Sequence, residues 1–169
     1  MIRLLKTLTI LLIAALPARV VAQPAPVSAE AAAGHPALIM KQASAAFQAG
    51  RRDEATFLFY FGQLRYRARL ILAPDTRGDG DGALFASLME TIGRPVNGHA
   101  YGDVPALLKI IERVLAADRS LPAPDLASPQ GRRAQEAARK GLRELADHIR
   151  ANRDMIRQQR QENGLENRN

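Results

Sequence analysis

The sequence predicts an all-α protein in which about five helices pack into a compact bundle. Three observations lead to this prediction. Apolar residues recur at the three- and four-residue spacing of amphipathic helices in several segments. One segment, residues 37–72, holds four of the five Phe and two of the three Tyr, which is enough to fill the centre of a bundle. The chain has no cysteine, so packing rather than disulfide bonds must hold the fold together.

The N-terminus has the pattern of a cleaved secretory signal peptide over residues 1–22. Arg3 and Lys6 precede a short apolar run at residues 8–16, and Ala22 ends a motif of small residues that suits cleavage. The apolar run is shorter than the ~20 residues that span a bilayer. We therefore expect a periplasmic or secreted protein with no transmembrane segment after cleavage. The alternative is that the same run serves as a membrane anchor.

The charge of the chain does not indicate a nucleic-acid partner. The formal net charge is +7, and much of the surplus lies after Ser128. Acidic residues are interleaved with the basic ones there, and no aromatic side chain follows Ser128 to stack on bases. A solvated, basic helix face is the better interpretation.

The first elements are expected to be a flexible leader and a helical hairpin. Residues 23–35 are rich in Pro and Ala, which is typical of a linker. A first helix should begin near Pro36 and end at Gly50, because glycine readily takes the left-handed conformation that terminates a helix. The apolar stripe of this helix comprises Leu38, Ile39, Ala43, Ala46 and Phe47.

A second helix should follow at once and lie in the middle of the bundle. Asp53 and Glu54 place negative charge in its first turn, which favours a helix N-terminus. The run from Phe57 to Phe61 is apolar on all sides, and such a helix has to be covered on more than one side. Beyond it the helix becomes amphipathic, with a core face formed by Leu64, Ala68 and Ile71.

The turn between these helices resembles the middle of a tetratricopeptide repeat and also Sel1-like repeats. The matching residues are Ala45, Phe47, Gly50, Asp53, Glu54, Ala55, Phe59 and Gly62. The resemblance covers about one repeat unit, residues 37–72, and the proline that usually closes a repeat is replaced by Arg67. It implies a helical hairpin rather than a stack of repeats, since at least three units are needed for such a stack.

Two further helices complete the predicted core domain at residues 36–118. A third helix is expected at residues 83–92, stopped by Gly93, and a fourth from Asp103, a good N-cap residue, to about Asp118. The connection between them, residues 94–102, is rich in turn residues.

The last third of the chain is predicted to be a linker at residues 119–128, a long basic helix at 129–162 and a disordered tail at 163–169. The helix carries a narrow apolar stripe of the kind found in coiled coils. That stripe could dock on the other helices or pair with a second copy of the chain.

No motif in the sequence indicates a metal or cofactor site. The acidic loop from Asp75 to Asp81 suggests calcium, but Leu84 falls where a calcium loop requires glycine, which favours a solvated turn. His35, His99 and His148 do not have the spacing of a helical zinc pair. We expect no cofactor, no metal and no catalytic residue.

One group of residues is a candidate for recognition. The connection between the third and fourth helices could fold beside the second helix and bring polar and aromatic residues together on a loop, where recognition often occurs. The candidate binding residues are Arg65, Tyr66, Arg69, Asn97, His99, Tyr101 and Asp103. The alternative is that Tyr101 fills the core and Asp103 only caps a helix.

These observations favour an exported, non-enzymatic helical protein that binds another protein, such as an immunity or inhibitor protein or an envelope scaffold. The alternative is an envelope enzyme or small-ligand-binding protein whose site the sequence does not reveal.

Overall fold

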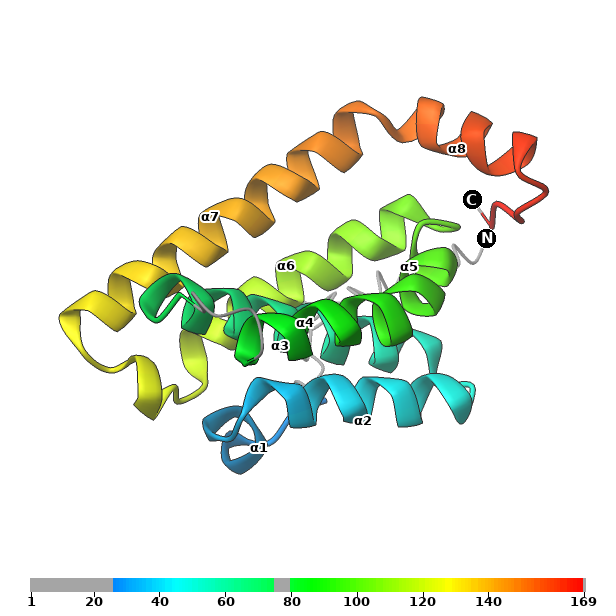
Figure 1. The fold of residues 1–169 in the computed structure, drawn as a ribbon. Helices are drawn as coiled ribbons and strands as arrows, with labels where there is room; N and C mark the ends of the chain where they lie inside the picture. Colours follow the sequence, from blue (N-terminus) through cyan, green and yellow to red (C-terminus); the bar gives the residue numbers. More distant parts are fainter. Residues whose placement is uncertain (1–25, 75–79, 169) are drawn as a thin grey trace, which may run out of the picture.

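The computed structural model of the chain describes residues 26–74 and 80–168 (Figure 1). The predicted signal peptide and most of the Asp75–Asp81 loop lie outside these residues. Within them the protein is all-helical and has no strand, as predicted. None of the described helices combines the length and the apolar composition needed to cross a membrane.

The described residues form more helices than the five predicted. In chain order the α-helices are α1 (Ala29–Ala33), α2 (Pro36–Gln48), α3 (Arg52–Leu72), α4 (Asp81–Leu88), α5 (Arg94–Ala100), α6 (Val104–Ser120), α7 (Pro129–Ala151) and α8 (Arg153–Glu162). A π-helical turn, η1 (Met89–Gly93), joins α4 to α5, and a 3-10 turn, η2 (Pro124–Leu126), precedes α7.

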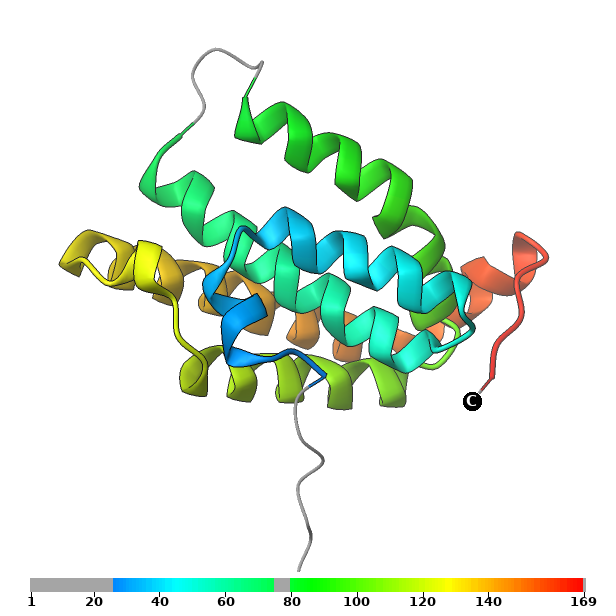
Figure 2. The same cartoon turned by 90° about the horizontal axis from the view of Figure 1, so that it is seen from below.

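Helix α3 lies in the middle of the bundle. It contacts α2, α4, α5, α6 and α7, and Figure 2 shows α2 running beside it with α6 and α7 on other sides. Each residue from Phe57 to Phe61 is at most 2% exposed. The prediction that this aromatic run is a helix enclosed by its neighbours is therefore confirmed.

Helices α2 and α3 form a tight hairpin that turns at Gly50. Gly50 has a φ of +79°, which is the left-handed region that glycine adopts without strain. Farther along the hairpin, a Cβ added to Gly62 would lie 2.7 Å from Met40 Cγ and 3.3 Å from the Met40 backbone nitrogen. The absence of a side chain at Gly62 thus allows the two helices to cross closely.

The segment predicted as a flexible leader contains a packed helix. Ser28 caps α1 by accepting a hydrogen bond from the Ala31 backbone nitrogen at 3.1 Å, and Val27 and Ala32 are buried. Alanine has the highest helix propensity, and its small side chain lets this short helix lie against the bundle. Within residues 26–35, the expectation of a flexible leader is therefore wrong.

The turn-rich connection predicted at residues 94–102 is largely helical. The π-helical turn carries the chain from α4 into α5 without a stop at Gly93, and Pro95 occupies the first turn of α5, where it needs no backbone donor. A Cβ on Gly93 would lie 2.8 Å from Phe59 Cζ. Gly93 therefore serves close packing on α3 rather than helix termination.

The long C-terminal helix is divided in two and docks on its own chain. Asn152 leaves the helical conformation, and its side-chain nitrogen donates to the His148 carbonyl oxygen at 2.8 Å, beside the bond from its own backbone nitrogen at 3.0 Å. Such side-chain bonds to the backbone are typical of helix ends and bends. Helix α7 packs against α3 and α6. Buried residues of its apolar stripe, among them Ala138, Leu142 and Ile149, thus belong to the core of the chain itself.

Residues 163–168 of the C-terminal tail are also held in place, contrary to the predicted disorder. The Arg168 backbone nitrogen donates to the Gly102 carbonyl oxygen at 2.7 Å. Arg160 donates to the carbonyl oxygens of Gly98 and Glu166, at 2.9 and 2.7 Å. The chain therefore returns to the α5–α6 corner, as Figure 1 also shows.

Candidate functional site

The structure does not bring the seven predicted binding residues together. Asn97 and Tyr101 lie beside the first half of α3, whereas Arg65, Tyr66 and Arg69 lie in its second half. About two and a half turns, roughly 13 Å of helix, separate Tyr60, which bonds Asn97, from Arg69. These residues hold neighbouring elements together at separate places.

Arg65 belongs to a buried ion cluster. Its side chain is 4% exposed and pairs with Asp118, whose side chain is fully buried. Arg139 of α7 binds the second carboxylate oxygen of Asp118 with an Nε–Oδ2 distance of 2.6 Å. Arg65 also donates to the carbonyl oxygens of Pro122 at 2.8 Å and Leu121 at 3.1 Å. The cluster therefore ties α3, α6, α7 and the linker to one another, and no sequence pattern indicates it.

Tyr66 and Arg69 converge on Asp81 at the start of α4. The Tyr66 hydroxyl donates to Asp81 Oδ1 at 3.3 Å, and an Arg69 nitrogen lies 3.9 Å from Oδ2. Burial and the Asp81 charge raise the pKa of Tyr66 to about 12. Arg69 lies closer to Asp125 than to Asp81, with an Nη1–Oδ2 distance of 2.5 Å. Asp81 is thus engaged in holding α4 to α3.

Asn97 and Tyr101 form a small polar cluster with Tyr60. The Tyr60 hydroxyl donates to Asn97 Oδ1 at 3.0 Å. Burial, followed by the neighbouring Tyr101, raises the pKa of Tyr60 well above its ordinary value, and burial also raises the pKa of Tyr101. Both phenols therefore stay neutral at physiological pH and act as hydrogen-bonding plugs between α3 and the α5–α6 corner.

His99 and Asp103 lie at the same corner, near the C-terminal tail. Asp103 caps α6 by accepting a hydrogen bond from the Ala106 backbone nitrogen at 2.9 Å. An Arg168 nitrogen lies 3.3 Å from the His99 ring nitrogen Nε2 and donates to the His99 carbonyl oxygen at 2.8 Å. Burial, then Arg168 and Arg52, lowers the pKa of His99. The alternative reading of Asp103 as a helix cap accounts for its contacts.

An apolar groove of about 500 Å³ lies between α3, α4 and α7. We call it the α3–α7 groove. Helix α3 lines it with Gln63, Leu64, Arg67, Leu70 and Ile71, and α4 adds Phe85. The wall from α7 consists of Ala137, Ala138, Gly141, Leu142 and Leu145. None of the seven predicted residues lines this groove.

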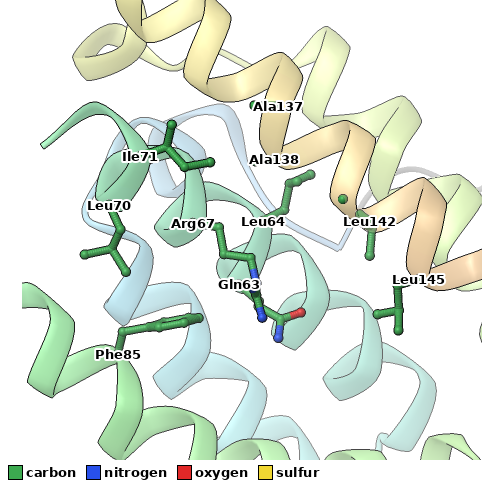
Figure 3. Close-up of a pocket in the computed structure, with 11 residues that line it drawn as sticks. Gln63, Leu64, Arg67, Leu70, Ile71, Phe85, Ala137, Ala138, Leu142 and Leu145 are labelled. Atoms are coloured by element: carbon green, nitrogen blue, oxygen red, sulfur yellow. The ribbon is translucent and has the colours of Figure 1, made fainter. Parts of the chain in front are cut away.

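Two polar side chains lie in the groove, as Figure 3 shows. Gln63 is buried and its side-chain nitrogen contacts Met89 Sδ at 3.3 Å. Arg67 is exposed, and its guanidinium carbon lies 5.7 Å from the centre of the Phe85 ring, close enough for a weak cation–π contact. Among the described residues, no carboxylate pairs with Arg67. A cation in an apolar groove is a feature that ligands and partners can recognise.

Other functional chemistry is not evident in the described residues. No group of three or more His, Asp or Glu side chains there is placed to hold a metal ion. In comparisons with known proteins, the chain matches no family model, no curated protein and no solved structure. What the groove can bind therefore follows from its own geometry and chemistry.

Sequence reasoning assigned the groove residues to other roles. Leu64 and Ile71 are predicted on the core face of the second helix, Arg67 is named only where it replaces the proline that closes a repeat, and the α7 wall falls within the predicted long basic helix at 129–162. One signal could have indicated the groove, namely Gly141. A glycine in the interior of a long, exposed helix costs stability, so its presence calls for a reason.

Proposed function

We propose that this chain is an exported helical protein that binds another protein through the α3–α7 groove, as an immunity or inhibitor protein or an envelope scaffold does. The observation that carries the proposal is the groove itself, an apolar surface with one exposed arginine that has no carboxylate partner among the described residues. Apolar clefts that contain few polar groups are typical recognition sites. The N-terminal pattern at residues 1–22 supports export.

Several acidic side chains already have structural roles, which favours binding over catalysis. Asp118 forms ion pairs with Arg65 and Arg139 inside the bundle. Asp81 holds Tyr66, and Asp103 caps α6. The α2–α3 hairpin adds a weaker argument, since its sequence resembles one tetratricopeptide unit and proteins built from such units bind partners on their concave surfaces.

The test compares two small-to-large substitutions at exposed helix positions. Gly141→Leu places a bulky side chain in the groove, and Ala116→Leu makes a similar change on the exposed face of α6. The tagged chain is cross-linked in its own cells and recovered with its partners. We expect the same stoichiometric partner with the wild type and Ala116→Leu, and its loss with Gly141→Leu. Recovery of the partner at equal yield from both variants, or of no stoichiometric partner at all, would contradict the proposal.

Small-ligand binding is the second candidate, and the size of the groove favours it. About 500 Å³ lies within the range of ligand pockets. An apolar carboxylate could place its chain on Leu70 and Phe85 and its charge on Arg67. In that case the purified protein would retain or bind the small molecule without any protein partner, which mass spectrometry of the native protein would detect.

A further inference from the structure

The two long walls of the α3–α7 groove are of equal length. On α3 the lining residues run from Gln63 to Ile71, and on α7 they run from Ala137 to Leu145. Each wall spans roughly 12 Å, or a little more than two turns, at 1.5 Å per residue. Phe85 of α4 borders the groove on the other side of α3 (Figure 3). A further helix laid on α3 between α4 and α7 would contact each wall over about two turns.

Three of the five residues of the α7 wall are small, namely Ala137, Ala138 and Gly141. Three glycines lie within the two longest helices, α3 and α7. A Cβ on Gly62 or Gly131 would come within 3 Å of another part of the chain, whereas a Cβ on Gly141 would meet no atom within 4 Å. Gly141 thus lowers the stability of α7 by up to ~1 kcal/mol without a packing reason in the described residues. Close approach of another backbone would supply that reason.

The charge of the groove indicates what the occupant carries. Three arginines follow one another at alternate positions of α3. Arg65 pairs with Asp118 and Arg69 pairs with Asp125. Arg67, between them, is exposed in the groove, and no described carboxylate pairs with it. A carboxylate on the occupant would pair with Arg67, as Asp118 and Asp125 pair with the other two arginines. An ion pair beside an apolar surface is stronger than one in open water.

We infer that the groove binds an acidic amphipathic helix of a partner protein, an inference that rests on the proposed function and specifies its partner. Apolar side chains at helical spacing on this helix pack on Leu70, Ile71 and Phe85. Its backbone lies close to Gly141, and an Asp or Glu at the edge of its apolar face pairs with Arg67. A small apolar acid could satisfy Arg67, but it would not require a glycine on α7.

The probe is a phage-displayed library of helix-favouring peptides of about 14 residues, roughly four turns. Selection is made on the purified chain with residues 1–22 omitted, and the best peptide is then measured by fluorescence anisotropy. We expect enriched peptides to combine apolar residues at helical spacing with an Asp or Glu beside them. Binding should weaken about tenfold in Arg67→Glu, the change expected for one charge pair of about 1.4 kcal/mol. It should also weaken in Gly141→Leu.

Matched controls separate the groove from general charge and stability effects. Lys109→Glu makes the same change in net charge on the exposed face of α6 and should leave binding unchanged. Replacing the acidic residue of the peptide with Lys should restore affinity for Arg67→Glu and weaken binding to the wild type. This reversal would not follow from a simple loss of folding.

Three outcomes would overturn the inference. Enriched peptides that bind Arg67→Glu and Gly141→Leu as tightly as the wild type would place the helix site elsewhere. Failure to enrich any helical peptide, while capture of the natural partner still depends on Gly141, would reject the helical occupant and leave the proposed function standing. Binding of palmitate that is lost in both variants, with no helical binder found, would assign the groove to a small apolar acid. The proposed function itself fails if no stoichiometric partner is captured, or if Gly141→Leu and Ala116→Leu capture the partner at equal yield.

Discussion

Replacing Asp118 with Asn should strongly destabilise the bundle. The carboxylate of Asp118 is fully buried and binds both Arg65 and Arg139. Asn has a similar size but no charge, so the change leaves the buried Arg65 guanidinium without a negatively charged partner. Breaking a buried ion pair by removing one partner costs about 3–5 kcal/mol. Because Asn keeps one acceptor oxygen, we expect about 3 kcal/mol, or roughly 10 °C in melting temperature.

Urea unfolding followed by far-UV circular dichroism measures this loss. The matched control is Asp125→Asn, which breaks the half-exposed pair with Arg69 and should cost less than about 1 kcal/mol. The double variant Arg65→Met with Asp118→Leu removes both charges and should recover part of the stability, because no buried charge is stranded on α3. If Asp118→Asn lowered the free energy of unfolding no more than Asp125→Asn does, the ion cluster would not be a main source of stability for the fold.

Three further predictions concern packing, pH and export. Gly62→Ala should destabilise the chain by about 1–3 kcal/mol, because its Cβ would meet Met40, whereas Gly141→Ala should stabilise it by up to ~1 kcal/mol; urea unfolding of both variants would show opposite signs. The lowered pKa of His99 means that the unfolded chain binds a proton more readily, so stability is lost as the pH falls from about 6.5 through the folded-state pKa. His99→Gln should lose less stability than the wild type between about pH 7 and pH 5, and an equal loss would count against this linkage. Cell fractionation and mass spectrometry should find a periplasmic or secreted chain that begins at Gln23; an intact N-terminus would refute cleavage after Ala22.

The sequence was sufficient to predict the fold class and the central position of α3. Both predictions depend on local information, because periodic apolar residues predict helices and the run from Phe57 to Phe61 has to be covered on all sides. The hairpin turn at Gly50 was likewise readable, since glycine is the residue that ends helices in this way.

The errors have physical causes that a single sequence hides. Gly93 looked like a helix stop, but its role is to let Phe59 approach. The segment 129–162 looked like one continuous helix, but it breaks at Asn152, whose side chain also donates to the His148 carbonyl oxygen. The Ala-rich segment at α1 looked like a linker because it has almost no large apolar residue.

The candidate site was not predictable from the sequence, because its walls come from distant parts of the chain. The sequence alone does not distinguish the roles of Arg65 and Arg67. Arg65 is structural because it pairs with Asp118, which lies 53 residues later in the chain, whereas Arg67 lies in the groove. Which side of the α7 stripe stays uncovered depends on where α4 lies. Periodicity does not carry that information.

Because α3 lies in the centre of the bundle and also lines the groove, some of its residues are constrained by folding and Arg67 by binding. Almost every side chain from Ala55 to Tyr66 is buried, so a complete substitution scan should show poor tolerance there in any assay that reports the amount of folded protein. Arg67 would differ from these neighbours. Its replacements would leave protein abundance unchanged and reduce only the activity that depends on the partner, which makes it the position at which to look for variants that fold but do not bind.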